Sequence, residues 1–412
     1  LRVEWEGQAG PQRLPYTLPD ARSLRLALSG TADSVFVLNP VRNLAGAMLH
    51  AGADSLTNVV WSDEDVLYQD RYGSVPAAGP LRFVAAPAAQ PERAGAVAII
   101  APEALLPSAR QWAAYRESAG GGSYEVDLVV LEDLVHRYRN GTRDAMALRA
   151  WLADRQARET TPIAVVLWGD ALYRNPADVP PSWFVPTFGH KASDALLLDL
   201  DADGIEDVPV GRIPVRTNEA GSAFVSKITT YEQVPPAAWQ KQALFVSGGQ
   251  TSTERRLLRE DTQAFGAQFA AAQLALQSTY IHKSDGPWVD GEVLTTLRTR
   301  LADGVSWLTY FGHSALDQWE IITDPPPAFG NEGRYPIVLS LGCYTGDFAG
   351  GDASVALESL AESLVLTPSA GAIVHIGTSN LAYKLARGMI LVPKVGIFYP
   401  LQTKLSLILV PL

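Results

Sequence analysis

Short, largely apolar runs recur along the chain from position 95 onward, and amphipathic segments separate them. The runs are Ala96–Ile100, Glu125–Leu131, Ile163–Trp168, Ala243–Val246, Trp307–Phe311, Ile337–Leu341 and Ala372–Ile376. Helical periodicity is found between them, at about 105–118, 143–156, 218–232 and 253–273. Buried strands that alternate with helices are typical of parallel sheets with right-handed crossovers. The pattern therefore predicts an α/β protein with two halves, 95–235 and 240–390.

The first 90 residues have a different pattern. Short strand-like segments such as Ser23–Leu28 and Ser34–Leu38 are separated by turn residues, and only Leu44–Leu49 has helical character. A Pro/Ala-rich run at 85–91 is typical of a linker. We therefore predict a β-rich N-terminal domain over 1–90 that contains no chemical motif. Residues 391–412 form a tail to which no structure is assigned.

Composition narrows the classes of function. Hydrophobic residues make up 47% of the 412 residues and the net charge is -11, so the chain can build a full core. An acidic protein is poorly suited to bind nucleic acid, which requires clustered Lys and Arg. The most apolar tail, 389–412, is interrupted by Pro393, Lys394, Pro400 and Lys404. That spacing excludes a membrane-spanning helix of about 20 apolar residues.

A histidine and the only cysteine follow two of the predicted strands directly. Gly312-His313-Ser314 comes after Trp307–Phe311, and Gly342-Cys343-Tyr344 comes after Ile337–Leu341. Parallel strands place their carboxyl ends at one edge of the sheet, where reactive groups gather. A thiol becomes a strong nucleophile when an imidazole takes its proton, and the amides of Cys343 and Ser314 could form an oxyanion hole. Without further evidence, packing roles for His313 and Cys343 fit the strand positions equally well.

Five blocks in the chain resemble the gingipain family, in the same order as in that family. They are Val165–Asp170, Val210–Val215, Lys227–Glu232, Tyr310–Ala315 with Trp319, and Leu341–Phe348. The family has a Gly-His-Gly motif with a Trp six residues after the His, and a Cys motif that ends in Gly-Asp-Phe. The resemblance covers about 95–385. It implies a caspase-like fold and peptide-bond hydrolysis by Cys343 and His313 through a thioester.

The resemblance also implies protein or peptide substrates, no cofactor for the chemistry, and a bacterial protein that is secreted or displayed at the cell surface. Two residues depart from the family pattern. Ser314 replaces a Gly after the histidine, and Ser247 occupies the strand-end position where the family commonly has an acid that orients the imidazole. We assign Ser247 that orienting role, although Ser stabilises an imidazolium less than a carboxylate does. The alternative is a non-catalytic caspase-like module in surface adhesion or secretion-linked assembly.

Residues that select the substrate side chain are expected in two places. The turn after Gly248-Gly249 leads to Glu254, which would favour a basic side chain, whereas a gapless register with the family puts Leu258 at the selecting position. Trp319 and Tyr383 are also expected to contact substrate, because the family's specificity pocket falls near 378–383.

An acidic loop suggests a structural metal. Asp199, Asp201, Asp203 and Asp207 follow a D-x-D-x-D-G-x-x-D pattern whose alternate carboxylates suit Ca²⁺. The final position of an EF-type loop is Val210, which supplies no ligand, so a solvated acidic turn is the alternative. No histidine shares zinc-ligand spacing with Cys343.

Overall fold

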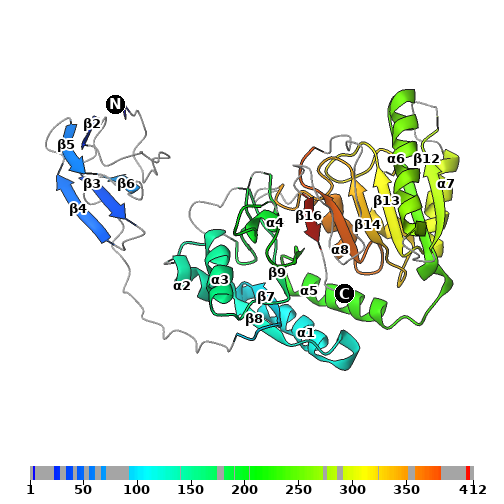
Figure 1. The fold of residues 1–412 in the computed structure, drawn as a ribbon, viewed down its shortest axis with the longest axis horizontal. Coiled ribbons are helices and arrows are strands. Elements are labelled where there is room, and N and C mark those ends of the chain that lie inside the picture. The colour runs from blue at the N-terminus through cyan, green and yellow to red at the C-terminus, as the bar shows by residue number, and fades with distance from the viewer. Residues whose placement is uncertain are drawn as a thin grey trace. The chain divides into compact units, whose positions relative to one another are not determined.

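The computed structural model describes most of residues 92–381 and isolated strands outside that range. The gaps within 92–381 are residues 140, 174–180, 190, 204, 272–275, 285–290, 323 and 351–357. The chain divides into two compact units, Leu1–Ala85 and Ala86–Leu412. Each unit is described by itself below (Figure 1).

The N-terminal unit contains two small sheets of three strands each, in the orders β1-β2-β5 and β4-β3-β6. The strands are β1 (Val3–Glu4), β2 (Ser23–Ala27), β3 (Ser34–Asn39), β4 (Leu44–His50), β5 (Ser55–Val60) and β6 (Val66–Asp70). The predicted strands at 23–28 and 34–38 are confirmed. The helical interpretation of Leu44–Leu49 is wrong, because β4 pairs antiparallel with β3.

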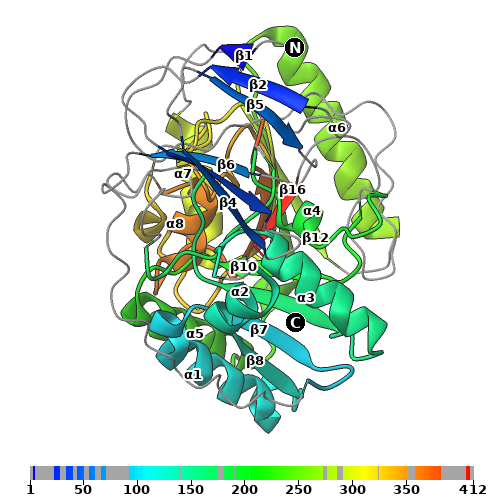
Figure 2. The same cartoon turned by 90° about the vertical axis from the view of Figure 1, so that its left-hand side faces the viewer.

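The larger unit begins with a parallel four-stranded sheet in the order β10-β9-β7-β8. Its strands are β7 (Val97–Ala101), β8 (Val126–Val130), β9 (Ala164–Trp168) and β10 (Val210–Ile213). Every residue of β7, β9 and β10 is buried, as expected for strands covered on both faces. Helix α1 (Leu106–Glu117) packs along β8, as Figure 2 shows.

A second sheet of six strands follows, in the order β12-β11-β13-β14-β15-β16. Its strands are β11 (Gln242–Ser247), β12 (Gln277–His282), β13 (Trp307–Phe311), β14 (Ile337–Leu341), β15 (Val374–Thr378) and β16 (Leu405–Ile408). All neighbours are parallel except β16, which runs antiparallel to β15. Strand β16 comes from the tail to which the sequence assigned no structure, and it contacts β10 of the first sheet.

Most of the predicted helices are found within two or three residues of their expected bounds. Besides α1, the helices are α2 (Leu131–Arg139), α3 (Met146–Ala157), α4 (Asp194–Leu197), α5 (Asn218–Glu232), α6 (Ser252–Ala271), α7 (Gly291–Asp303) and α8 (Leu360–Leu366). Helix α5 begins where expected because the Thr217 side chain accepts a hydrogen bond from the Ala220 amide and caps it. The sequence patterns did not reveal α2, α4, α7, α8, β10 or β12.

One hydrophobic core runs through both sheets. Phe224 and Ile228 of α5 pack in the same cluster as Val166 and Trp168 of the first sheet and Phe245 of the second. Lys227, on the same helix, donates to the carbonyl oxygens of Leu364, Val365, Thr367 and Ala370 at 2.8–3.1 Å, around the end of α8. The two halves therefore share apolar and polar contacts.

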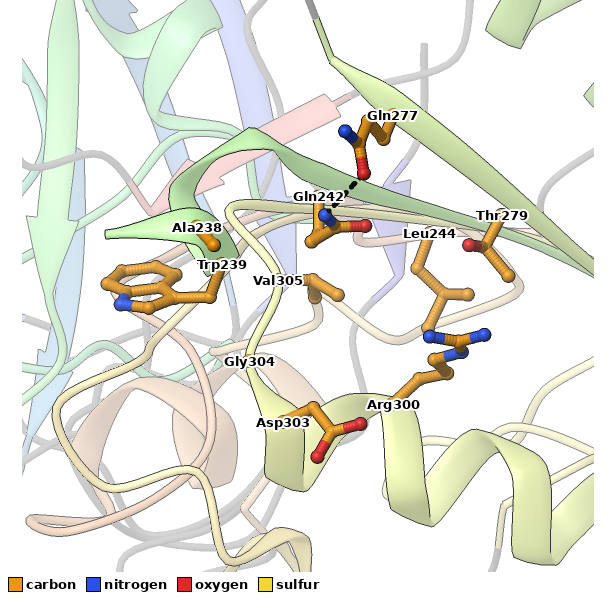
Figure 3. Close-up of a pocket in the computed structure, with 10 residues that line it drawn as sticks. All are labelled: Ala238, Trp239, Gln242, Leu244, Gln277, Thr279, Arg300, Asp303, Gly304 and Val305. Carbon is orange, nitrogen blue, oxygen red and sulfur yellow. Dashed lines mark hydrogen bonds between the residues drawn. The ribbon is translucent and has the colours of Figure 1, made fainter. Parts of the chain in front are cut away.

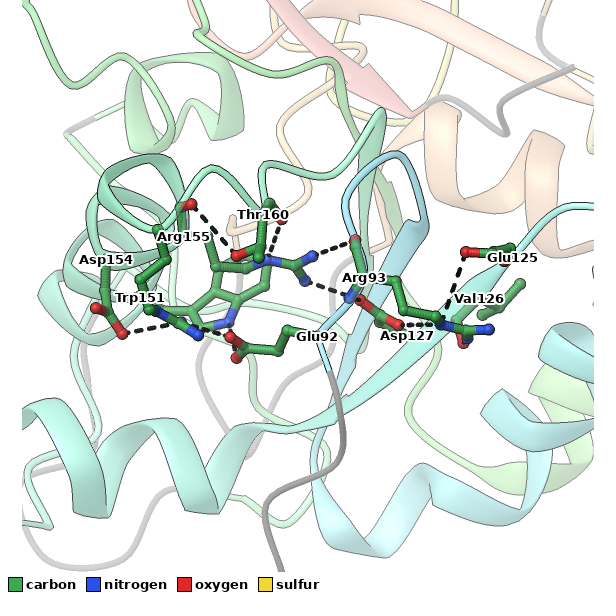
Figure 4. Close-up of polar contacts among 10 residues, drawn as sticks. Glu92, Arg93, Glu125, Val126, Asp127, Trp151, Asp154, Arg155 and Thr160 are labelled. Carbon is green, nitrogen blue, oxygen red and sulfur yellow. Dashed lines mark hydrogen bonds and ion pairs between the residues drawn. The ribbon is translucent and has the colours of Figure 1, made fainter.

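The amino-terminal edge of the first sheet is held by buried charges (Figure 4). Asp127 at the start of β8 accepts hydrogen bonds from the Arg93 amide at 2.9 Å and from the Arg155 guanidinium at 3.0 Å. Arg155 is fully buried and also donates to the carbonyl oxygens of Arg93 and Thr160. These contacts tie the entry of the chain into the larger unit to α3.

Candidate active site

His313 and Cys343 lie at one edge of the second sheet. Strands β13 and β14 pair in parallel, with Phe311 opposite Leu341. His313 and Cys343 are each two residues beyond that pair, so both follow their strand at the same level. The Ser314 hydroxyl donates to the Cys343 carbonyl oxygen at 2.7 Å, and this bond joins the two turns directly. The structure thus places the two residues that the sequence singled out at the same edge of one sheet, on adjacent strands.

The imidazole of His313 is exposed to solvent and faces a carboxylate. Its side chain is 46% exposed, and its Nε2 lies 3.6 Å from Oε2 of Glu254. The backbone of the same turn is fixed from below, because the Tyr310 hydroxyl donates to the His313 carbonyl oxygen at 2.5 Å. Burial and the nearby Glu320 carboxylate raise the pKa of Tyr310, which keeps this hydroxyl protonated and able to donate.

Glu254 is held in place by the loop that precedes α6. Its Oε2 accepts hydrogen bonds from the amides of Gln250 at 2.9 Å and Thr251 at 3.0 Å. The Thr251 amide, then the Gln250 amide, lower the pKa of Glu254, and His313 contributes further. The carboxylate is therefore ionised at neutral pH and can orient the imidazole electrostatically. The sequence had assigned Glu254 to substrate selection, and its place beside His313 was not foreseen.

Ser247 has a different partner from the one predicted. Its hydroxyl lies 2.7 Å from Nδ1 of His282, which is opposite Ser247 in the pairing of β11 with β12. Ser247 is buried at the sheet edge, and burial lowers the pKa of His282 to about 4, so that imidazole is neutral. The orienting role assigned to Ser247 is therefore corrected: the group that lies against the His313 ring is Glu254.

The turn that contains Cys343 is anchored to the first half of the unit. Tyr344 has a φ of +61°, a left-handed conformation that non-glycine residues rarely adopt. Asp347 accepts hydrogen bonds from Lys191 at 2.8 Å and from the Tyr173 hydroxyl. The Lys191 ammonium lies 4.8 Å from the Tyr173 ring centre and 4.9 Å from that of Tyr344. These contacts stabilise the strained turn next to the half-buried Cys343.

The other three residues predicted to contact substrate, Trp319, Leu258 and Tyr383, differ in their surroundings. Trp319 is buried, stacks on Tyr310 with ring centres 4.8 Å apart and donates its indole N–H to Ser340 at 2.8 Å. Its assignment to substrate binding is wrong, because the indole is part of the core. Leu258 is half-buried on α6 and packs against the shared core. Tyr383 lies outside the described residues.

A second carboxylate near His313 was missed altogether. Glu320 accepts a hydrogen bond from the His313 amide and forms an ion pair with Lys283. In the sequence, Glu320 stands out only because it follows Trp319 directly, seven residues beyond His313. That spacing matches no recognisable motif, so it did not indicate a contact with His313.

The acidic loop gathers three of its four predicted ligands. One carboxylate oxygen each from Asp199, Asp201 and Asp207 lies within 4.8 Å of the others. Asp203 is not in this group, and its carboxylate accepts a hydrogen bond from the Ile205 amide at 2.9 Å. Asp199 is buried, whereas Asp201 and Asp207 are exposed. Three hard oxygen donors at this spacing fit a divalent cation such as Ca²⁺.

A pocket of about 320 Å³ lies at the opposite edge of the second sheet (Figure 3). Gln242 and Gln277, the first residues of β11 and β12, are joined above it by a side-chain hydrogen bond of 2.8 Å. Arg300 and Asp303 of α7 line its other side. His313 and Cys343 follow the carboxyl ends of the strands, so this pocket is separate from them.

The fold and site define an α/β protein with a cysteine and a histidine at the carboxyl edge of a parallel sheet. A family model for peptidase family C25 matches residues 90–394. The chain therefore belongs to peptidase family C25, the family of the gingipains, which confirms the resemblance drawn from the sequence.

Solved structures support the same fold. The pro- and mature domains of Porphyromonas gingivalis RgpB match with a TM-score of 0.53 at 16% identity, over 70% of this chain and 64% of that one. Gingipain R, described as an Arg-specific cysteine proteinase, matches with a TM-score of 0.53 at 15% identity, over 72% and 65%. The chain thus spans less than two thirds of these relatives. The predicted caspase-like fold is confirmed.

Comparison with curated proteins gave no significant match. Among the residues that the structure describes, no helix has both the length and the apolar character needed to cross a bilayer.

Proposed function

We propose that this chain is a cysteine endopeptidase with Cys343 as nucleophile and His313 as general base. The observation that supports the proposal most is the hydrogen bond from Ser314 to the Cys343 carbonyl oxygen, which holds the two turns together at one sheet edge. Membership of a peptidase family supports the class of reaction. The substrates proposed are proteins or peptides, and the net charge of -11 argues against nucleic acid.

The proposed reaction follows from the chemistry of the pair. Cys343 Sγ attacks the carbonyl carbon of the scissile bond while its proton passes to His313. Because Nε2 faces Glu254, we assign the transfer to Nδ1. The amides of Cys343 and Ser314 donate to the oxyanion. When the C–N bond breaks, His313 returns the proton to the leaving amine, and a thioester remains. Water then loses a proton to His313 and attacks the thioester carbon. The C–S bond breaks, the acid is released, and His313 returns the proton to Cys343 Sγ.

Glu254 bears on the alternative of a non-catalytic binding module. That alternative arose because Ser247 occupies the position of the family's orienting acid. An ionised Glu254 beside His313 supplies the missing charge from a different segment of the chain, which favours the enzyme. A module for adhesion or assembly has no need of an oriented imidazole beside a thiol.

The preferred substrate side chain is a separate matter. The Glu254 carboxylate is engaged by two amides and by His313, so it is a poor partner for a basic substrate side chain. An apolar residue, Leu258, stands at the selecting position in the gapless register. We therefore propose a preference for an apolar side chain before the cleaved bond.

A positional scanning library of fluorogenic peptides tests both proposals. We expect cleavage after apolar residues, and we expect Cys343→Ala to reduce the rate by roughly 10⁴-fold because it removes the nucleophile. Cleavage after Arg or Lys would refute the apolar preference alone. Cleavage by Cys343→Ala at more than a tenth of the wild-type rate would remove Cys343 from the mechanism, and no cleavage by the wild type would favour the binding module.

We also propose that Asp199, Asp201 and Asp207 bind a structural Ca²⁺, and that the protein is secreted or displayed at the cell surface, as the family resemblance implies. A cation that binds only the folded loop raises the melting temperature, with about 2.7 kcal/mol of stabilisation at a hundredfold excess over Kd. The double variant Asp201→Ala/Asp207→Ala should lose this shift, and Asp203→Ala should keep it. An equal shift in all three proteins would place the ion elsewhere.

A further inference from the structure

The carboxylate of Glu320 joins three strand ends around His313. Its Oε1 accepts hydrogen bonds from the Gly249 amide at 2.6 Å and from the His313 amide at 3.1 Å. Its Oε2 lies 2.8 Å from the Lys283 ammonium. Gly249 follows β11, Lys283 follows β12 and His313 follows β13. A single side chain therefore links the three turns.

Glu320 is itself held rigidly. Its amide donates to the His313 carbonyl oxygen at 3.0 Å, and Ser314 and Trp319 form an antiparallel bridge one residue further inside the same turn. The Trp319 indole beside it is buried and bonded to Ser340. The Glu320 and Lys283 side chains are only 12% and 8% exposed. Charged hydrogen bonds that are shielded from water hold their geometry better than exposed ones.

Two glycines leave room for this carboxylate. A Cβ atom at Gly248 would lie 2.0 Å from Oε1 of Glu320, and one at Gly312 would lie 3.0 Å from it. Gly249 has a φ of +121°, which turns its amide toward the carboxylate at a conformation that side chains disfavour. The local sequence of both turns is thus matched to the presence of Glu320.

The bond to Gly249 also reaches the group that contacts the imidazole. Gly249 opens the loop whose Gln250 and Thr251 amides hold Glu254, and Glu254 lies 3.6 Å from His313 Nε2. Glu320 therefore accepts one hydrogen bond from the loop that holds Glu254 and another from the turn that contains His313. Both bonds therefore connect the segment that holds Glu254 with the turn that carries His313.

We propose that Glu320 is a positioning residue for His313, which acts by fixing the imidazole turn against the loop that holds Glu254. This inference rests on the proposed role of His313 as general base. Glu320 does not touch substrate in this account. Its carboxylate acts on the backbone of the His313 turn, whereas the charge that faces the ring comes from Glu254. Removing it should disturb the rate of the chemical step more than substrate binding, since small misplacements of a catalytic group cost up to about a hundredfold.

The test compares Glu320→Ala, Glu320→Gln and the exposed control Glu260→Gln. For each we would measure kcat and KM for the best library peptide, the rate of Cys343 alkylation by iodoacetamide from pH 5 to 8, and the melting temperature. We expect Glu320→Ala to lower kcat about tenfold or more with KM changed less than about twofold, and to slow alkylation below pH 7. Glu320→Gln retains one acceptor and should recover part of both rates. Glu260→Gln should match the wild type.

Several results would overturn the proposal. Wild-type kcat and alkylation in Glu320→Ala, while Cys343→Ala is inactive, would refute the role of Glu320 and leave the proposed function standing. If Glu320→Gln loses activity only to the extent that its melting temperature falls, Glu320 stabilises the fold and does not position His313. Full cleavage by Cys343→Ala would refute the proposed function, and the role of Glu320 with it.

Discussion

The two sheets of the Ala86–Leu412 unit have polar residues at the carboxyl edges of their parallel strands, yet those edges differ in access to water. At the first sheet, Arg212 is fully buried and forms a two-pronged ion pair with the buried Asp194 at 2.7 and 2.8 Å. Asp170, after β9, is also fully buried and lies 2.6 Å from Arg216. At the second sheet, His313 is 46% exposed and Cys343 is half-buried.

The difference separates a structural use of charge from a chemical one. Buried ions are tolerated only when their partners are close and complete, as they are around Arg212, which also donates to the carbonyl oxygens of Gly169 and Val185. Such groups cannot reach a substrate. At the second edge the Glu254 and Glu320 carboxylates bind backbone amides, and Lys283 pairs with Glu320, while the imidazole remains exposed. A strand-end polar residue thus suggests chemistry only when its surroundings leave it accessible.

The largest expected effect on stability is at the carboxyl edge of the first sheet, where Arg212 and Asp194 are buried. Arg212→Met keeps most of the side-chain volume but leaves Asp194 as a buried carboxylate without its main partner. We expect a loss of about 3–5 kcal/mol in the free energy of unfolding. Urea denaturation measures it, with Arg256→Met, which removes an exposed helix pair, as the control. A loss below about 1 kcal/mol would show that the first edge is not held by this ion pair.

The next effect appears only at acidic pH and comes from His375, which lies inside the second sheet. It is fully buried on β15, and burial lowers its pKa to about 3. The unfolded chain therefore binds a proton at pH values where the folded chain does not. Stability is complete above the ordinary histidine pKa of about 6.5 and falls as the pH drops toward 3, by up to about 1.4 kcal/mol per pH unit.

His375→Leu should flatten the fall in melting temperature between pH 6.5 and 4, because the group that titrates is gone. The matched variant His136→Leu, at an exposed histidine, should show the same dependence of melting temperature on pH as the wild type. An unchanged slope in His375→Leu would assign the acid sensitivity to other groups.

The smallest effect on stability is expected at the carboxyl edge of the second sheet, where His313 is exposed. His313→Ala removes an exposed ring whose nearest side-chain partner, the Glu254 carboxylate, lies 3.6 Å away, so the free energy of unfolding should change by less than about 0.5 kcal/mol. A loss comparable to that of Arg212→Met would mean that both edges are structural, and the contrast between them would fail.

The sequence predicted the fold and the central pair because those features are local. Unbroken apolar runs identified β13 and β14, and the glycine that follows each run marked the turns of His313 and Cys343. Strand β12 was missed because it is an edge strand with exposed positions, so its sequence has no continuous apolar run. Patterns of this kind reveal burial, and an edge strand is only partly buried.

The surroundings of the pair could not be predicted in the same way. Glu254 and Glu320 contact His313 from different segments of the chain, and Lys283 pairs with Glu320 from a third. No spacing along the chain encodes that arrangement. Trp319 was misassigned for a related reason: its position after His313 matches the family, but the sequence does not show which way the ring points.

The most direct measurement of the central claim is the rate at which iodoacetamide alkylates Cys343 at pH 6. The chain contains one cysteine, so a single mass increase reports its reactivity. If His313 takes the proton of the thiol, the wild type should react at least about tenfold faster than His313→Ala, because an isolated thiol is almost entirely protonated at this pH. Equal rates in the two proteins would contradict the pairing of Cys343 with His313.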